Sequence, residues 1–389
     1  MNPYLNKDFQ NASSLYKEGL ANREVIDNCR KKVAQITQAK PTEVIFTASG
    51  TESANLAIIG SARAIQEKIK SAQDTVRSTQ HGANNIENFR PHIITTNIEH
   101  VAVLESCRRL EKEGFDVTYL KVNEKGLIRD EDVKNALRPE TVLVSVVLAN
   151  NEIGTIFPLR QIGVVLDKYK KDQNRIRTDY PYLHTDASQA PNYLPVNIDK
   201  LNADLMTLDG SKIYGPKGIG CLVTKSYVPI ESILYGGGHE SNLRPGTENT
   251  SHIVGFTTSL EITEEIKEKE TERIVNLQKY FLDKLNQEIP SAVINGDLKN
   301  RLPNNINICI PNLNSEFAVI QLDDLGIACA AMTACKNLAG ESNSYVVEAL
   351  GNNCGKSSLR FTIGRETTKK DIDLAIKAIQ IVIKLQKLS

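Results

Sequence analysis

An alternation of strand-like and helical segments constrains the fold of this chain more than any other feature. Helical segments such as Val101–Glu113 and Glu131–Leu137 lie between short runs of β-branched and apolar residues. These runs are Val44–Thr47, His92–Thr96, Val117–Leu120, Val142–Leu148 and Ile219–Val223. Such alternation predicts an α/β fold, with a mostly parallel sheet covered by helices.

The length of the chain and its later segments predict a second domain. At 389 residues the chain is long for one domain. A charged helical run, Leu260–Glu288, resembles a connecting helix, and a capping box of Thr368 and Asp371 opens an amphipathic helix over Thr368–Leu388. We expect a large domain over 1–255 and a smaller α+β domain over 256–389.

Composition and charge exclude several classes of protein. Lys+Arg and Asp+Glu are 47 each, so no basic excess points to nucleic acid or to a membrane surface. No apolar run of membrane length and no signal peptide is present, which favours a cytoplasmic protein. Seven cysteines without a C-x-x-C pair predict reduced thiols and no metal site.

Two polar stretches are interpreted as solvated surface segments. Lys70–Arg90 is rich in Gln, Asn and Ser, and Lys168–Asp179 is a cluster of charges. The first has the composition of a mobile loop. Docking of a partner protein on either stretch is the alternative.

One lysine stands where α/β proteins place their chemistry. Lys212 follows an apolar strand, Asp204–Leu208, and precedes a glycine-rich turn in Leu208–Gly220 (LDGSKIYGPKGIG). An amine near apolar surface loses its proton more easily and can form a Schiff base. A surface lysine in a turn is the alternative.

Two further strand ends carry polar residues of the types that bind anions and rings. In Phe46–Ser53 (FTASGTES), Gly50 and Thr51 are expected phosphate contacts at a helix N-terminus, or simply part of a tight turn. His184–Ala190 (HTDASQA) presents Asp186 and Gln189. A carboxylate there needs a protein cation, giving a buried salt bridge, or a protonated ring nitrogen.

The remaining candidates each have a structural alternative. His100 starts a helix, and Asn151 of the NNEIG segment follows a strand, where asparagines can simply cap a turn. Arg360 lies in an apolar run and suits carboxylate recognition. Cys335 lies in a loop of small residues, either as a mobile nucleophile or as an inert thiol. Thr247 belongs to a glycine-rich segment, Gly236–Thr247.

Taken together and in this order, SKIYGPKGIG, NNEIG and HTDASQA resemble the cysteine desulfurases. These are pyridoxal-phosphate (PLP) enzymes of the aminotransferase class V group, and the resemblance runs from about Phe9 to the C-terminus. It implies a type I PLP fold with a seven-stranded sheet. The spacing between Cys335 and Tyr345 resembles the long-loop variant associated with iron–sulfur cluster assembly and other sulfur delivery.

The resemblance also implies roles for residues around the cofactor ring. Lys212 would be the Schiff-base lysine, and Asp186 would keep the pyridine nitrogen protonated. His100 would stack on the ring, while Asn151 and Gln189 would bond to its phenolic oxygen.

Other residues would bind the phosphate and the substrate. Gly50, Thr51 and Ser211 would hold the phosphate, with Thr247 reaching in from a second subunit of a homodimer. Arg360 would bind the substrate carboxylate, assisted by Asn151.

The implied reaction converts L-cysteine to L-alanine and leaves a persulfide on Cys335. The implied partners are a sulfur acceptor or an iron–sulfur scaffold protein, and Cys335 could contact a transferred cluster. A selenocysteine lyase or another PLP β-lyase is the alternative enzyme. A degenerate scaffold that only binds a partner is the non-enzymatic alternative.

Three departures from the family pattern bear on these roles. The chain starts beyond the usual first strand and its Thr-Thr-Pro turn, so part of the pocket rim is expected to be missing. The family's Ser-Gly-His before the lysine is Asp209-Gly210-Ser211 here. Asp209 would repel a phosphate unless it points away or pairs with a cation. Met332 and Thr333 replace small residues before Cys335, which is expected to stiffen that loop.

Overall fold

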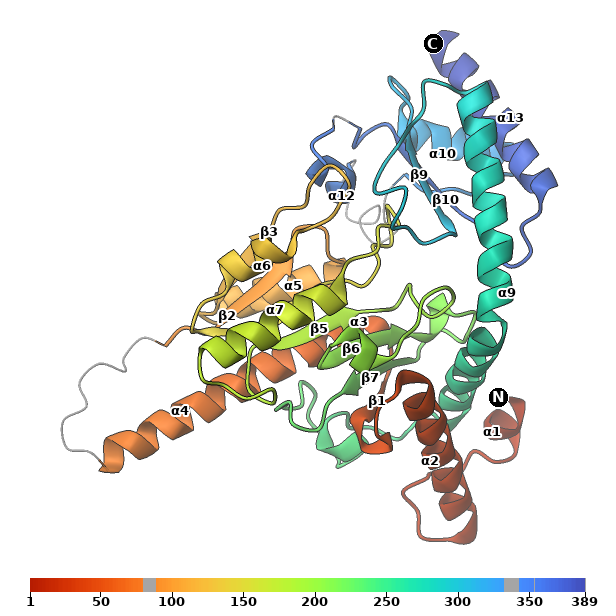
Figure 1. Cartoon of the computed structure of the whole chain (residues 1–389). Coiled ribbons are helices and arrows are strands. Elements are labelled where there is room, and N and C mark those ends of the chain that lie inside the picture. The colour runs from red at the N-terminus through yellow and green to blue at the C-terminus, as the bar shows by residue number, and fades with distance from the viewer. Residues whose placement is uncertain (80–88, 332–342, 353, 389) are drawn as a thin grey trace. The chain divides into compact units, whose positions relative to one another are not determined.

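The computed structural model describes residues 1–79, 89–331, 343–352 and 354–388 (Figure 1). In chain order its helices and strands are α1 (Asn2–Asn6), α2 (Lys17–Thr37), β1 (Val44–Thr47), α3 (Gly50–Asn55), α4 (Ser61–Thr79), β2 (His92–Thr96), α5 (Val101–Lys112), β3 (Asp116–Leu120), α6 (Asp130–Ala136), β4 (Thr141–Ser145), α7 (Leu159–Asp172), β5 (Tyr182–Asp186), α8 (Ile198–Leu201), β6 (Leu205–Asp209), β7 (Gly220–Thr224), α9 (Thr250–Glu288), β8 (Val293–Ile294), β9 (Asn305–Cys309), α10 (Ser315–Asp324), α12 (Tyr345–Ala349), β10 (Ser358–Thr362) and α13 (Lys369–Leu388).

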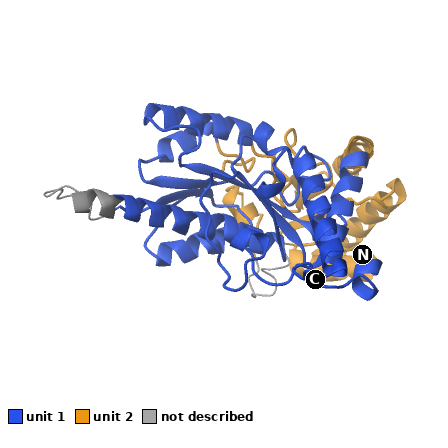
Figure 2. Cartoon of the chain, turned by 90° about the horizontal axis from the view of Figure 1, so that it is seen from below, with its two compact units in different colours: residues 1–120, 129–148, 158–265 blue, residues 121–128, 149–157, 266–389 orange. Residues whose placement is uncertain are grey.

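The larger sheet has seven strands in the order β1-β7-β6-β5-β4-β2-β3. Strands β6, β5, β4, β2 and β3 pair in parallel, whereas β7 is antiparallel to both β1 and β6. Figure 2 shows helices on both sides of this sheet. The predicted α/β fold is therefore confirmed, because crossover helices are what parallel strands require.

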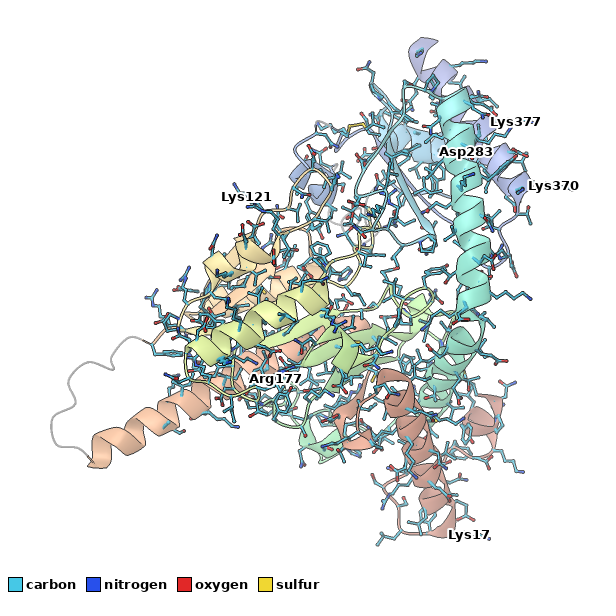
Figure 3. The ribbon with its side chains drawn as sticks, in the orientation of Figure 1. Lys17, Lys121, Arg177, Asp283, Lys370 and Lys377 are labelled. Carbon is cyan, nitrogen blue, oxygen red and sulfur yellow. A yellow bond between two sulfur atoms is a disulfide. The ribbon has the colours of Figure 1, made fainter. Side chains whose placement is uncertain are left out.

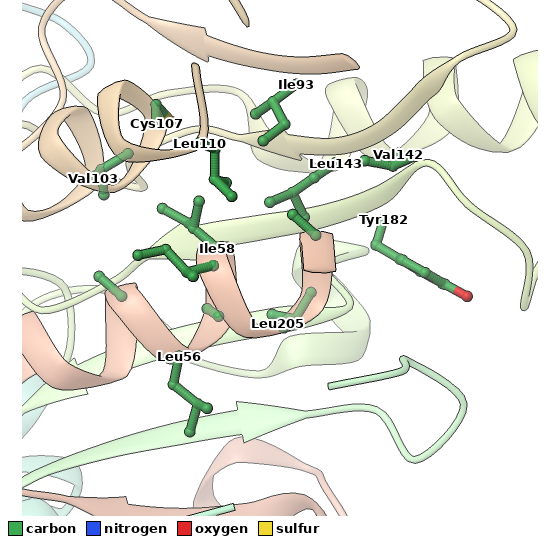
Figure 4. Packing of buried hydrophobic residues seen from close by; sticks show 14 of the residues in the cluster. Leu56, Ile58, Ile93, Val103, Cys107, Leu110, Val142, Leu143, Tyr182 and Leu205 are labelled. Carbon is green, nitrogen blue, oxygen red and sulfur yellow. The ribbon is translucent and has the colours of Figure 1, made fainter. Parts of the chain in front are cut away.

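The core of this sheet is built from its β-branched strands and the apolar faces of four helical segments. Figure 4 shows Leu56 and Ile58 of a π-helical turn, Leu56–Gly60, with Cys107 and Leu110 of α5, packed on sheet residues such as Leu143. These side chains are at most 1% exposed. Burying a Leu or Ile stabilises a fold by about 1.5–3 kcal/mol, so this cluster fixes the sheet that carries the site.

The chain divides into two compact units (Figure 2). Unit 1 comprises residues 1–120, 129–148 and 158–265, and unit 2 comprises residues 121–128, 149–157 and 266–389. The division thus lies within α9 rather than at residue 255, and two short segments from the first half belong to unit 2. Early in α9, Phe256 packs edge-on against Phe46, with ring centroids 6.3 Å apart. Later in the helix, Phe281 packs against Phe361 at 5.5 Å.

Unit 2 contains a small antiparallel sheet in the order β10-β9-β8. Helix α13 begins where the sequence predicts, since the Thr368 hydroxyl donates a hydrogen bond to Asp371 at 2.8 Å. Cys309 at the end of β9 is bonded to Cys354 in a disulfide. The expectation of reduced thiols is therefore wrong for this pair.

The prediction of two solvated surface segments is wrong in part. Helix α4 continues through the first part of this stretch to Thr79. Its earlier residues Ala62, Ile65 and Ile69, at helical spacing, pack against the core. Residues 80–88 lie outside the described part of the chain.

In the second stretch, Lys170 is only 1% exposed, and its Nζ donates to the carbonyl of Arg177 at 3.1 Å. Arg177 (labelled in Figure 3) in turn pairs with buried Asp204 at 2.6 Å. Among the described residues, no helix has the length and apolarity that crossing a membrane requires.

Candidate active site

The ends of β5 and β6 bring the principal candidates to one edge of the sheet of unit 1. The two strands are parallel neighbours, with Asp186 opposite Thr207. Asp186 ends β5, and Asp209 ends β6 and leads into a 3-10 turn, Gly210–Lys212. Parallel strands end at the same edge, which is where open α/β sheets bind ligands.

Asp186 is 9% exposed and has one oxygen available for a ligand. Its Oδ1 accepts a hydrogen bond from the Ser188 amide at 2.9 Å. Among the described residues, no side chain forms an ion pair or a hydrogen bond with its Oδ2. For the alternative of a buried salt bridge, the described part of the chain offers Asp186 no cationic partner. A cationic group of a ligand can pair with the carboxylate instead.

A buried histidine supports Asp186 from within the sheet. The ring of His184, two residues earlier on β5, bonds to Ser145 Oγ at 2.8 Å and to Thr207 Oγ1 at 3.0 Å. Burial lowers the pKa of His184 to about 3, so the ring is neutral. The imidazole thus links β4, β5 and β6 without adding charge beneath the carboxylate.

The main chain of Lys212 is held by hydrogen bonds, and the residue is exposed to solvent. Its carbonyl accepts a hydrogen bond from Asn192 Nδ2 at 2.7 Å, and the Gly215 amide closes the turn on the Gly210 carbonyl at 3.0 Å. The expectation that apolar surface encloses this amine is not met in the chain as described. Its exposure agrees with a surface lysine and equally leaves the amine accessible to an aldehyde.

His100 caps α5 in a fixed orientation. Its Nδ1 accepts a hydrogen bond from the Ala102 amide at 3.2 Å, and the ring is half-buried. The residue before it, Glu99, is completely buried, and its Oε1 accepts from the Thr96 hydroxyl at 2.7 Å and from the Val147 amide at 3.0 Å.

Burial raises the pKa of Glu99 to about 8, and the negative charge of Asp186 adds to the rise. Glu99 was not predicted as a site residue. The signal in the sequence was an acid between the apolar Ile98 and His100, three residues after the end of a strand.

The expected phosphate contacts surround a carboxylate. The Gly50 amide at the start of α3 donates to Asp209 Oδ2 at 2.8 Å. The Ser211 amide and hydroxyl both donate to Oδ1, at 2.8 Å and 2.6 Å. Asp209 therefore neither points away from these donors nor pairs with a cation among the described residues, so neither condition that would relieve its repulsion of a phosphate is met there. Thr51 is exposed on the first turn of α3.

Two further candidates, Gln189 and Thr247, also belong to unit 1. Gln189 is half-buried. Thr247 is exposed on a cavity of about 210 Å³ that Phe46, Glu240 and Arg244 also line. Glu240 is held there because Arg30 donates two hydrogen bonds to it, at 2.6 and 2.8 Å.

Unit 2 brings Arg360 and Asn151 together. Arg360 lies on β10, and its Nη1 donates to the Asn151 carbonyl at 3.1 Å. Burial lowers the pKa of Arg360, while the charge of Glu152 opposes that effect. Cys335, the expected nucleophile, lies outside the described residues. Among the described residues, no group of acids, cysteines or histidines could hold a metal ion.

The family model for "Aminotransferase class-V" matches residues 1–374. A curated protein called "Cysteine desulfurase IscS" from Dictyoglomus turgidum is 37% identical over 392 residues, covering 100% of this chain and 91% of that protein. One of the same description from Pseudomonas aeruginosa is 38% identical, covering 97% of this chain and 86% of that protein.

Solved structures are similar over the same length. A structure described as a NifS-like protein matches with a TM-score of 0.84 and 27% identity, covering 99% of this chain and 94% of that chain. The chain therefore belongs to the aminotransferase class-V family and, within it, to the cysteine desulfurases of the IscS and NifS-like type.

Proposed function

We propose that this protein is a cysteine desulfurase that transfers the sulfur of L-cysteine to Cys335 and releases L-alanine. The observation that carries the proposal is the pair formed by a buried carboxylate with an available oxygen, Asp186, and an accessible amine, Lys212, at the ends of adjacent parallel strands. The similarity to curated desulfurases over the full chain supports it.

The residues of unit 1 fit the ring and the aldehyde of PLP. Such a cofactor supplies an electron-withdrawing ring that stabilises negative charge at the substrate α-carbon. Asp186 Oδ2 can accept a hydrogen bond from the N–H of a pyridinium ring and so keep that nitrogen protonated, and the His100 ring can lie against an aromatic face. Gln189 is half-buried and can donate to a phenolic oxygen. Lys212 would hold the cofactor aldehyde covalently and, as a free amine, would accept the α-proton of the substrate.

The substrate and the sulfur are assigned to unit 2. Arg360 binds the carboxylate of L-cysteine through its planar fork of donors, and Asn151 helps to orient that guanidinium. The thiolate of Cys335 forms a bond to the substrate sulfur while the bond from that sulfur to the β-carbon breaks. The β-carbon gains a proton, so cysteine and a thiol give alanine and a persulfide.

A second copy of this chain and a sulfur acceptor complete the proposal. Thr247 stands exposed on unit 1 and is assigned to the phosphate of a partner subunit's cofactor. The Cys335 persulfide passes its outer sulfur to a thiol of an acceptor or an iron–sulfur scaffold protein.

The test measures alanine and sulfide from L-cysteine with PLP and a reducing thiol. We expect equal amounts of both products from the wild type, and at least a hundredfold loss in Cys335→Ala because the sulfur has no acceptor. Cys329→Ala, a half-buried cysteine of the same segment, is the matched control and should retain activity.

Undiminished alanine formation from L-cysteine in Cys335→Ala would contradict the proposal. Alanine formed by that variant from selenocysteine alone would indicate a selenocysteine lyase. No product from the wild type with either substrate would indicate a non-catalytic scaffold.

A further inference from the structure

A carboxylate of the protein already binds the donors that the family resemblance assigns to the cofactor phosphate. Gly50 and Ser211 supply two backbone N–H groups and one hydroxyl, and all three donate to Asp209. Backbone N–H groups at a helix start and in a tight turn are the donors that phosphates use in proteins. Two anions cannot accept from the same donors at the same time.

Asp209 also lies in close contact with the start of α3. A Cβ added to Gly50 would lie 3.0 Å from both Cβ and Oδ2 of Asp209, so the carboxylate fills the space beside that glycine. On the neighbouring strand, Gly220 pairs with Asp209, and a Cβ at Gly220 would lie 2.4 Å from the Ser49 carbonyl carbon. The start of α3 is therefore packed closely against β6 and β7, and the Asp209 carboxylate lies in contact with it.

No positive side chain offsets this charge within the described residues. Asp209 forms no ion pair there, and Arg244, which reaches α3, is paired with Glu52 at 2.9 Å. A phosphate dianion brought to Gly50 and Ser211 would displace or repel the carboxylate, since like charges a few ångströms apart oppose each other strongly.

We propose that Asp209 is a specificity-determining residue that weakens selection for the phosphorylated form of the cofactor. The carboxylate acts as a built-in anion at the phosphate position, so PLP loses most of its usual advantage over pyridoxal, which has a hydroxymethyl group there. This inference rests on the proposed cofactor site at Lys212.

The test compares two aldehydes that differ only in the phosphate. PLP and pyridoxal are titrated into wild type, Asp209→Ser and Asp209→Asn, and dissociation constants are taken from the change in cofactor absorbance, with Lys212→Ala as the blank. Serine restores the hydroxyl of the family pattern, and asparagine removes the charge while keeping the shape. Asp172→Asn removes one exposed negative charge elsewhere and is the matched control.

We expect Asp209→Ser to bind PLP about tenfold more tightly or better, because one unit of repulsion is removed. Pyridoxal affinity should change by less than about twofold, since it has no charge to be repelled. Asp209→Asn should shift PLP affinity in the same direction, and Asp172→Asn should shift neither.

Two results would overturn the inference in different ways. Equal PLP affinity in wild type, Asp209→Ser and Asp209→Asn, with Lys212-dependent binding intact, would refute the role of Asp209 and leave the cofactor site standing. Binding of neither aldehyde by any folded variant, judged by unchanged thermal unfolding, would refute the site and the inference together.

Discussion

Two carboxylates end adjacent parallel strands of unit 1, yet their surroundings differ. Asp186 is 9% exposed and accepts one hydrogen bond, from the Ser188 amide. Asp209 is half-buried and accepts three hydrogen bonds, one from Gly50 and two from Ser211. The comparison shows that position in a fold does not settle what a side chain can bind. Asp186 has an oxygen available for a ligand cation, whereas Asp209 uses its oxygens on donors of the protein.

Substitution of Lys212 tests whether the available oxygen of Asp186 binds a cofactor that is attached to this lysine. We expect Lys212→Ala to lower alanine formation from L-cysteine at least about a thousandfold, because positioned proton transfer and covalent attachment are both lost. Turnover with saturating PLP is the measurement. Lys217→Ala, an exposed lysine of the same turn, should keep most of the activity. Similar losses in both variants would indicate a defect of the turn rather than of one amine.

Asp186→Asn tests the available oxygen directly. The variant keeps the shape and a carbonyl acceptor but removes the charge that would stabilise a protonated ring nitrogen. We expect turnover to fall about a hundredfold or more. The absorbance of bound PLP should also shift, while unfolding by denaturant should change little because Asp186 has no ion pair among the described residues. Full activity in this variant would remove the functional difference between the two carboxylates.

Arg360 extends the comparison to a partly buried cation of unit 2. We expect Arg360→Ala to raise the KM for L-cysteine about tenfold to a hundredfold, since a charge-assisted pair of hydrogen bonds is lost. PLP affinity should change much less. Arg360→Lys keeps the positive charge but lacks the planar pair of donors. Its KM for L-cysteine should fall between those of the wild type and Arg360→Ala. Equal loss of cysteine and PLP affinity would contradict the assignment.

Glu99 adds a third carboxylate, one that is protonated near neutral pH. Its pKa is about 8 in the folded chain against an ordinary value of 4.5, so the folded state holds an extra proton between these values. The free energy of unfolding attributable to Glu99 therefore falls as pH rises from 4.5 to 8.

Glu99→Gln should remove this dependence, so the wild type should lose about 2 kcal/mol or more relative to the variant between pH 5 and pH 9. Denaturant unfolding at both pH values measures it. Glu105→Gln, exposed on α5, should keep the wild-type slope. Parallel pH profiles for wild type and Glu99→Gln would show that Glu99 is ionised in the folded protein.

The sequence predicted the sheet well because its strands are buried on both faces. Val44–Thr47 and His92–Thr96 were placed to the residue, since continuous β-branched runs leave little ambiguity. Helix α4 was misjudged beyond Lys70 because polar residues outnumber its apolar stripe there. The burial of Lys170 could not be predicted, because its acceptor is a carbonyl of Arg177, which no composition reveals.

The sequence predicted which residues form the candidate site better than it predicted what those residues contact. The motifs predicted Lys212, Asp186 and His100 as site residues, and the family comparisons confirm the family that the motifs indicated. What the sequence could not show is that Asp209 turns toward Gly50, which lies far away in the chain. That contact depends on the packing of β6 against α3. The Cys309–Cys354 disulfide was missed for the same reason, since the spacing of its cysteines has no recognisable pattern.

The attachment of the cofactor to Lys212 is tested most directly by chemical trapping. Purified protein is incubated with PLP, reduced with borohydride, digested and analysed by mass spectrometry. The account predicts one modified peptide, with the added mass on Lys212 and none in Lys212→Ala. A modification carried by another lysine, or no modification of folded protein at saturating PLP, would contradict it.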